Sequence, residues 1–116
     1  MKNITKKILL ECGIGAHFTG FDYLGEALEM VVEDKGVLSG ITKRLYPKIA
    51  KRYDTRWQLV ERAIRHAIER AFDNLYPDDI SKIYGNSLDP RRGKPTNSQF
   101  IATVAVLYGD EIRAGE

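Results

Sequence analysis

The most regular hydrophobic pattern in the chain lies in residues 55–72, TRWQLVERAIRHAIERAF. Apolar residues recur there at the i, i+3, i+4 and i+7 spacing of an amphipathic helix, which predicts one buried stripe. The stripe consists of Val60, Ala63, Ile64, Ala67, Ile68, Ala71 and Phe72. The opposite face is mostly cationic and carries Gln58, Arg62, Arg65, His66 and Glu69. Thr55 and Gln58 have the spacing of a capping box, so we expect the helix to begin at Thr55.

A shorter pattern immediately upstream predicts a second helix over residues 46–54, YPKIAKRYD. Its inward residues are Ile49, Ala50 and Tyr53. Ala50 and Val60 are ten residues apart, as in many helix-turn-helix units, where a small residue on the first helix lets the second cross closely. Pro47 either kinks one continuous helix or lies in the first turn of a separate one, because proline lacks an amide.

Two further helices are predicted in the N-terminal part, separated by a glycine-rich loop. Apolar positions predict a short helix over residues 4–12, and the string GIGAHFTG at residues 13–20 predicts a loop. The glycines of this loop do not match the dinucleotide-binding fingerprint. Residues 21–34 predict an amphipathic helix with an acidic outward face, made of Glu26, Glu29, Glu33 and Asp34. A phosphate backbone would repel this face, so we expect it to lie away from any nucleic acid.

The remaining segments also have helical patterns or loop composition. Residues 37–45 continue helically, and residues 75–85 predict a turn at Pro77, a short helix and a glycine stop. Residues 86–97 have the composition of a loop. Its basic cluster could reach a phosphate or simply be solvated, and consists of Arg91, Arg92 and Lys94. The last predicted helix covers residues 98–108 and is capped by Thr96 or Asn97. Its apolar set is wider than one stripe, which indicates partial burial by a second subunit.

These elements predict an all-α fold of about six helices, because no segment shows the pattern of a β-strand. The 116 residues, 43% of them hydrophobic and 29% charged, fit a single domain over residues 1–116 with one core. The helix-turn-helix would occupy about residues 41–72.

Charge is segregated along the chain. Residues 43–70 contain nine Lys and Arg against three Asp and Glu, whereas the rest contains nine against thirteen, within a net charge of +2. A basic helix pair on an acidic remainder is typical of a protein that touches a polyanion with one face. The alternative is an ordinary amphipathic pair with a solvated charged face, and segregation alone does not identify DNA.

Several other classes are disfavoured by the sequence. Cys12 is the only cysteine, which permits neither an internal disulfide nor a cysteine-based zinc cluster and agrees with a reducing compartment. For His17 we expect a structural hydrogen-bonding role rather than a metal, and we expect no cofactor. No apolar run approaches the roughly 20 residues of a membrane span, and the N-terminal apolar segment is too short for a secretory signal, so we expect a cytoplasmic protein. A nucleophile, ligand cluster or phosphate loop is also missing, which disfavours an enzyme.

Three strings give the chain a resemblance to a known family. VERAIRHAIE at residues 60–69, ITKRLYPKIAKRY at residues 41–53 and KPTNSQFIA at residues 94–102 resemble the C-terminal DNA-binding effector domain of the stage-zero sporulation response regulator. This regulator is the master regulator of endospore formation. The resemblance runs from about Ile4 to about Val106 and is gapless after the glycine loop. VERAIRHAIE is far more specific than a generic helix-turn-helix pattern.

The resemblance implies a six-helix, winged-helix-like effector fold of the response-regulator type, with residues 55–72 as the recognition helix. It implies that Glu61 and Arg62 read base edges of a box similar to TGTCGAA, while Arg65 and His66 help hold the duplex. This chemistry is apt, because arginine can donate two hydrogen bonds to guanine and glutamate can accept one from cytosine.

The resemblance also implies two protein partners. The family region that matches residues 74–88 contacts the sigma subunit of RNA polymerase, and the last helix joins two copies on adjacent boxes. Both partners come to this chain only as hypotheses, a sigma contact through residues 74–88 and a homodimer through residues 98–108.

The chain also departs from the family. Leu59 replaces a base-contacting arginine, so specificity at that position is relaxed or shifts to contact with a thymine methyl group. Arg56, Trp57 and Gln58 replace small, hydroxyl-rich residues, and Gln58 could read an adenine or merely cap the helix. No receiver domain precedes the helices, so the chain is expected to be an isolated effector fragment or a stand-alone relative without phosphorylation in cis.

The sequence therefore predicts a DNA-binding transcription regulator, an activator or a repressor, rather than an enzyme. Base reading is assigned to Glu61, Arg62 and Gln58. Phosphate contacts are assigned to Arg65, His66, Arg56, Lys51 and Arg52. The alternative is a helical protein-interaction module that keeps the fold and acts through a full-length regulator or RNA polymerase. Salt distinguishes the two, because DNA binding releases counterions and weakens steeply as salt rises.

Overall fold

The computed structural model describes residues 1–116, apart from the side chain of Pro90. Within this described part the chain forms six α-helices and no β-strand. The helices are α1 (Asn3–Glu11), α2 (Thr19–Glu33), α3 (Tyr46–Arg52), α4 (Trp57–Asn74), α5 (Pro77–Tyr84) and α6 (Asn97–Ala114). The structure thus confirms the predicted all-α fold of about six helices.

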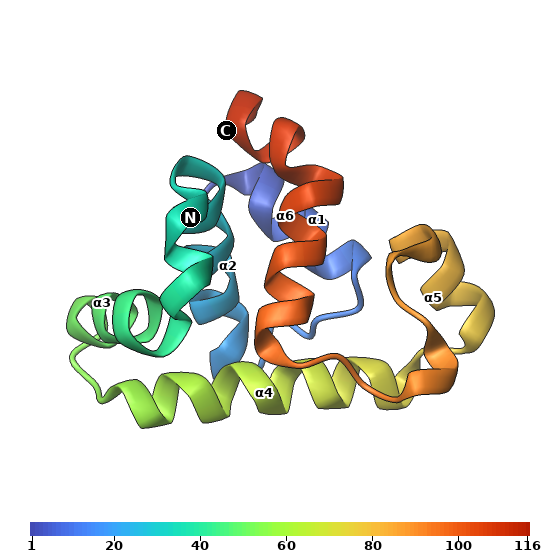
Figure 1. Cartoon of the computed structure of the whole chain (residues 1–116), viewed down its shortest axis with the longest axis horizontal. Helices are drawn as coiled ribbons and strands as arrows, with labels where there is room; N and C mark the ends of the chain where they lie inside the picture. The colour runs from blue at the N-terminus through green and yellow to red at the C-terminus, as the bar shows by residue number, and fades with distance from the viewer.

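The longest axis of the molecule follows α4, which runs along its base (Figure 1). The helices α2 and α6 stand on α4, α3 lies beside its first turns, and α5 lies near its far end (Figure 1). The two ends of the chain meet on the side away from α4, where the Ile4 amide donates to the Glu116 carbonyl oxygen over 2.8 Å. One long surface of α4 therefore remains uncovered.

The apolar stripe of α4 forms the middle of the core. Five of its seven predicted members are buried, namely Val60, Ile64, Ala67, Ile68 and Ala71, while Ala63 and Phe72 are partly buried. Gly20 permits the close crossing of α2 over this stripe, because a Cβ atom there would lie 2.7 Å from the Ala63 carbonyl carbon. The backbones of α2 and α4 thus approach each other closely at Gly20.

The connection between α2 and α3 differs from the predicted regular helix over residues 37–45. It consists of a 3-10 segment, η1 (Lys35–Gly40), followed by a short π-helical segment, η2 (Ile41–Leu45). Gly40 separates them with a non-helical backbone (φ −158°, ψ 56°). Pro47 then lies in the first turn of α3, so the second of the two predicted alternatives is correct.

The ends of α5 and α6 follow from identifiable signals. Pro77 begins α5 and Gly85 ends it with φ +59°, as the predicted glycine stop requires. Thr96 caps α6: its hydroxyl accepts from the Gln99 amide over 3.1 Å, and the Gln99 side chain accepts from the Thr96 amide over 2.9 Å. The predicted end of this helix near residue 108 is wrong, because α6 continues to Ala114 and buries Ile112.

Three other predictions need correction. The helix expected over residues 21–34 already begins at Thr19, and Glu26 is buried rather than outward. Tyr53, predicted to point inward, is 38% exposed because α3 ends at Arg52 and the chain turns away from the core. The helix expected to begin at Thr55 begins at Trp57, without a side-chain cap, and the Thr55 amide instead closes the preceding turn by donating to the Ala50 carbonyl oxygen.

Candidate nucleic-acid interface

The interface is built on α3, α4 and the short connection between them. Asp54 in this connection has φ +52°, a left-handed conformation that reverses the chain direction. The Thr55 amide then donates to the Ala50 carbonyl oxygen over 2.9 Å and closes the turn onto α3. Ala50 and Val60, the pair predicted to interlock, are both buried where the two helices pack. These features place α3 and α4 in a helix-turn-helix arrangement.

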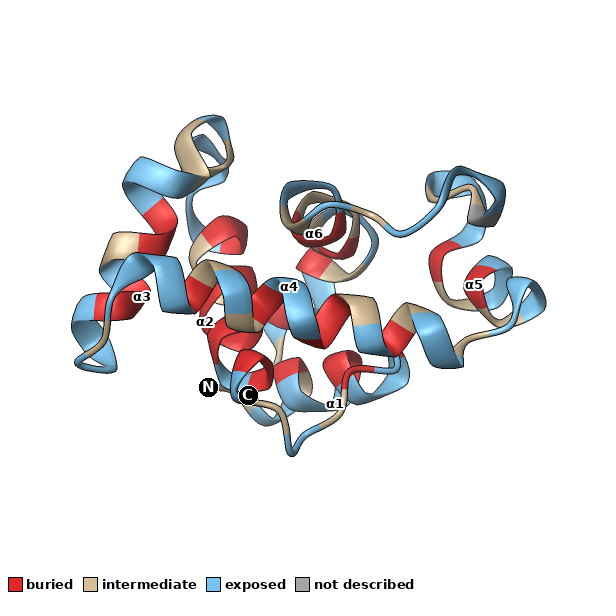
Figure 2. Ribbon diagram, turned by 90° about the horizontal axis from the view of Figure 1, so that it is seen from below, coloured by how far each residue is buried: buried red, intermediate tan, exposed pale blue. Residues whose placement is uncertain are grey.

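One face of α4 is exposed along its whole length. Figure 2 views the molecule from below, with α4 in front and its exposed residues alternating with the buried stripe. Of the predicted base-reading residues, Gln58 and Arg62 lie on this exposed face, and Glu61 is half-buried on its flank. The structure therefore places Gln58 and Arg62 on the exposed face of α4, with Glu61 beside them.

Glu61 is held by a neighbour one turn further along α4. The Arg65 Nε atom donates to Glu61 Oε1 over 3.1 Å, and Arg65 Nη1 lies 4.0 Å from Glu69 Oε1. The hydrogen bond to the Glu61 carboxylate raises the pKa of Arg65. Arg65, predicted to anchor a phosphate, also fixes the orientation of a predicted base reader.

The other predicted phosphate contacts lie on α4, just before it and at the end of α3. Arg56 precedes the first turn of α4, and Lys51 lies near the end of α3; both are exposed. The exposed His66 ring packs edge-to-face against Phe18, with ring centroids 5.4 Å apart. Arg52 is exposed too, but its Nη1 atom pairs with Glu26 on α2 at 3.3 Å.

An apolar hollow of about 510 Å³ lies along one flank of α4, between this helix and the loop that precedes α2. Leu59, Ala63 and Phe18 form its apolar wall, and Arg62 and His66 lie beside them. The sequence predicted a loop over these residues but did not indicate that Phe18 lies beside α4. Only the fold could reveal this contact, because nothing in the string GIGAHFTG indicates which helix it meets.

The opposite flank of α4 is tied to the first turn of α6. The Asn97 side-chain amide donates to the Tyr46 hydroxyl over 2.9 Å and to the Glu61 carbonyl oxygen over 3.2 Å. One side chain thus links α3, α4 and α6 at the position of a predicted base reader. The sequence reading considered Asn97 only as a possible helix cap.

Residues 5–107 match the family model described as the sporulation initiation factor Spo0A C terminal. The chain belongs to this family. The match spans nearly the same residues as the predicted resemblance and confirms it. The Spo0A C-terminal family consists of DNA-binding domains of a response regulator that controls transcription in sporulation, and it is a regulatory rather than an enzymatic family.

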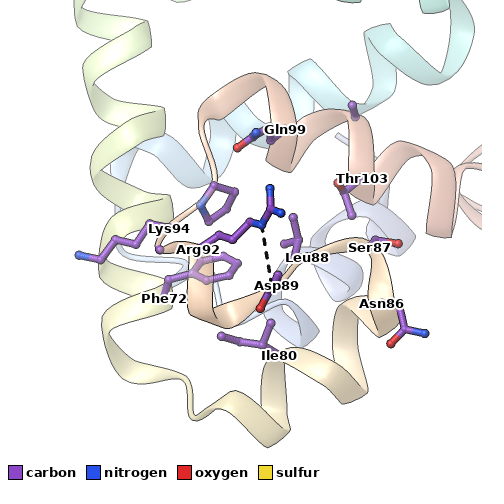
Figure 3. Close-up of a pocket in the computed structure, with 13 residues that line it drawn as sticks. Phe72, Ile80, Asn86, Ser87, Leu88, Asp89, Arg92, Lys94, Gln99 and Thr103 are labelled. Atoms are coloured by element: carbon purple, nitrogen blue, oxygen red, sulfur yellow. Dashed lines mark ion pairs between the residues drawn. The ribbon is translucent and has the colours of Figure 1, made fainter.

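A second hollow, of about 760 Å³, lies away from the helix-turn-helix, among the end of α4, α5, the following loop and α6 (Figure 3). Phe72, Ile80 and Leu88 supply apolar side chains to this hollow (Figure 3). Asp89 pairs with Arg91 at 3.2 Å and with Arg92 at 3.9 Å. Hydrogen bonds from Arg91 lower the pKa of Asp89, so its carboxylate stays charged at neutral pH.

The basic loop of this Spo0A-family chain is therefore internally paired. Lys94 forms an ion pair with Asp73 on α4, in addition to the two arginine pairs with Asp89. Both predicted roles of this loop, reaching a phosphate and remaining solvated, stay predictions.

Cys12 and His17 have separate surroundings. Cys12 is fully buried, and burial raises the pKa of its thiol to about 12. Its carbonyl oxygen accepts a hydrogen bond from the buried Tyr84 hydroxyl over 3.0 Å. The exposed His17 ring packs at a tilt against the Phe18 ring, with centroids 4.3 Å apart, so its contact is aromatic, in place of the expected hydrogen bond. In the described part of the chain, every helix is too short or too polar to span a membrane.

Proposed function

We propose that this chain is a sequence-specific DNA-binding transcription regulator that inserts α4 into the major groove. The observation that carries the proposal is the uncovered, largely cationic face of α4, which projects from the base of the molecule over 18 residues. A major groove about 12 Å wide admits one such helix. Membership of the Spo0A C-terminal family supports DNA as the partner.

Base reading is assigned to the N-terminal half of α4. Arg62 can donate two hydrogen bonds to guanine, Gln58 can pair with adenine, and Glu61 can accept from cytosine. Leu59 is 38% exposed beside Arg62 and can contact a thymine methyl group, in place of the arginine that the family resemblance implies there. Specificity would then resemble that of the TGTCGAA box with a changed preference at one position.

Phosphate contacts are assigned to the basic residues around this face. They are Arg65, His66, Arg56, Lys51 and Arg52. Glu29 and Glu33 lie in the C-terminal half of α2, which runs away from α4 (Figure 1), so they would not oppose the approach of DNA. Because each phosphate contact releases about one counterion, binding should weaken steeply with salt.

Two protein contacts accompany this function in our proposal. The surface over residues 74–88 would meet the sigma subunit of RNA polymerase, and Tyr76, 76% exposed, is its most prominent aromatic side chain. A second copy would pair through α6, where Val106 is 79% and Leu107 39% exposed. Exposed apolar side chains on a regular helix are suited to such an interface.

The same exposed residues of α6 support a second candidate function. A chain that had lost specific DNA binding could still act as a protein-interaction module, pairing through α6 with a full-length regulator or with RNA polymerase. Binding through an apolar helix interface would depend only weakly on salt, whereas DNA binding would weaken steeply as salt rises.

Fluorescence anisotropy of the purified chain tests both candidates. A duplex with TGTCGAA and a scrambled duplex are titrated at two salt concentrations. Selective binding that weakens with salt is the expected result. Salt-sensitive binding without selectivity would mean a different target sequence, and no binding to either duplex would refute the proposal in favour of the protein-interaction module.

A further inference from the structure

Glu26 is the one charged residue in the buried core of the described chain, with 7% of its surface exposed. Burying a carboxylate costs free energy unless the charge is paired and hydrogen-bonded. Glu26 lies within α2, on the side of this helix that faces the end of α3. Its partners are therefore found in the helix-turn-helix.

Two consecutive residues of the helix-turn-helix meet the Glu26 carboxylate. Arg52 Nη1 lies 3.3 Å from Oε2, and the Tyr53 hydroxyl donates to Oε1 over 3.5 Å. Burial and the nearby Glu26 charge raise the pKa of Tyr53, so its hydroxyl stays protonated and able to donate. The Tyr53 ring also packs edge-to-face on Tyr23 of α2, with centroids 5.1 Å apart.

The Arg52 side chain is held at one edge and open at the other. It is 68% exposed although one of its nitrogens contacts a carboxylate with only 9% side-chain exposure. A guanidinium has five N–H donors in a rigid fork, so the remaining donors of Arg52 are available to a second anion. The position of Arg52, just before the turn into α4, places that anion beside the recognition helix.

We propose that Glu26 is a positioning residue for DNA binding, which anchors Arg52 and Tyr53 so that the open edge of the Arg52 guanidinium meets a backbone phosphate. This inference rests on the proposed function, in which Arg52 contacts the backbone. A side chain that is already ordered loses less conformational entropy when it binds. The buried acid therefore strengthens binding to a polyanion despite its own negative charge.

A double-mutant cycle on DNA binding tests this role. Glu26→Gln keeps the size of the side chain and removes its charge, and Arg52→Ala removes the phosphate contact. We expect E26Q to weaken binding to the TGTCGAA duplex about two- to ten-fold, which corresponds to freeing one long side chain. In the R52A background, E26Q should change the affinity little, because the positioned group is absent.

Glu33→Gln is the matched control, since Glu33 is an exposed acid on the same helix and its loss changes the net charge equally. E33Q should bind DNA like the wild type. Thermal denaturation of every variant reports whether the fold is retained. If E26Q lowers the DNA affinity equally in the wild-type and R52A backgrounds, the role of Glu26 is merely structural. If E26Q binds DNA more tightly than the wild type, the acid only repels DNA. Either result overturns the inference.

Arg52→Lys keeps the test decisive if E26Q unfolds the chain. Lysine retains the charge and the exposed position but lacks the rigid fork, so R52K should lose affinity to a similar extent with an unchanged salt slope. If R52K binds DNA as tightly as the wild type, the inference is overturned. Failure of the proposed function and failure of this inference give different results. If the wild type binds no duplex, the proposed function itself is refuted. If the wild type binds DNA normally but positions 26 and 52 show no coupling, this inference alone is refuted.

Discussion

Gly20→Ala tests whether close contact between α2 and α4 sets the position of α4, the proposed recognition helix. A Cβ atom at Gly20 would lie 2.7 Å from the Ala63 carbonyl carbon and 2.9 Å from Ala67 Cβ, and closer still to the Ala63 carbonyl oxygen. Ordinary contacts between carbon atoms are about 3.5–4.0 Å, so the two helices would have to separate by roughly 1 Å. The obstructing atoms are backbone and an alanine methyl group, which cannot rotate away.

The size of the effect follows from two opposing contributions. Overpacking a core costs about 1–3 kcal/mol. Alanine favours a helix over glycine by at most about 1 kcal/mol, and less in a first turn such as that of Gly20. We therefore expect a net loss of about 1–2 kcal/mol in the free energy of unfolding, or a melting temperature lower by about 4–10 °C. Urea denaturation and thermal melting followed by circular dichroism measure both.

Gly25→Ala on the same helix is the matched control. The three atoms nearest to its Cβ atom would all belong to the flexible Met1 side chain, with Cγ at 2.9 Å and the sulfur and terminal methyl closer. This side chain can move aside, so G25A should be as stable as the wild type or slightly more stable. If G20A melts at or above the temperature of G25A, backbone contact between α2 and α4 does not limit their separation, and the reasoning is refuted.

Three further predictions concern the helix-turn-helix. Arg62→Ala should cost about 1–3 kcal/mol of binding to the TGTCGAA duplex and relax the preference at one base pair; an equal loss on scrambled DNA would contradict base reading. Arg65→Ala should weaken binding to all sequences and reduce the salt slope by about one. A loss confined to the box would instead mean that Arg65 acts through its contact with Glu61. Asp54→Gly should raise the melting temperature and Asp54→Val lower it, because a left-handed conformation costs an L-residue about 1–2 kcal/mol. Equal melting of these two variants would exclude the left-handed turn.

The sequence predicted the elements whose signals are local. The stripe of α4, the glycine stop of α5 and the Thr96 cap of α6 were all visible, because each depends on residues within one or two turns of a helix. The exposure of Gln58 and Arg62 followed from the same helical periodicity. The resemblance to the sporulation regulator family came from strings in α3, α4 and the start of α6, and the family match confirms it.

What the sequence did not predict depends on contacts between distant segments. Glu26 was placed outward by periodicity, yet it is buried because the end of α3 supplies a cation and a hydroxyl across 27 residues of chain. The sequence predicted that α4 begins at Thr55, because Thr55 and Gln58 have the spacing of a capping box. In the structure Thr55 instead closes the turn after α3, and this turn requires the left-handed conformation of Asp54. Phe18 beside His66 had no local signal at all.

The same helix serves as the centre of the core and as the proposed DNA-reading element, so packing and recognition cannot vary independently. Ile64 and Arg62 are two residues apart on α4, one fully buried and the other exposed. Asn97 extends this dependence to α6, because it donates to the backbone carbonyl oxygen of Glu61. A second copy bound to α6 would therefore contact a helix that is itself hydrogen-bonded to α4 through Asn97 in its first turn. In the proposed dimer, the orientation of each α4 helix would follow from the pairing of the α6 helices. This pairing would account for the proposed specificity on two adjacent boxes without contacts between the two α4 helices.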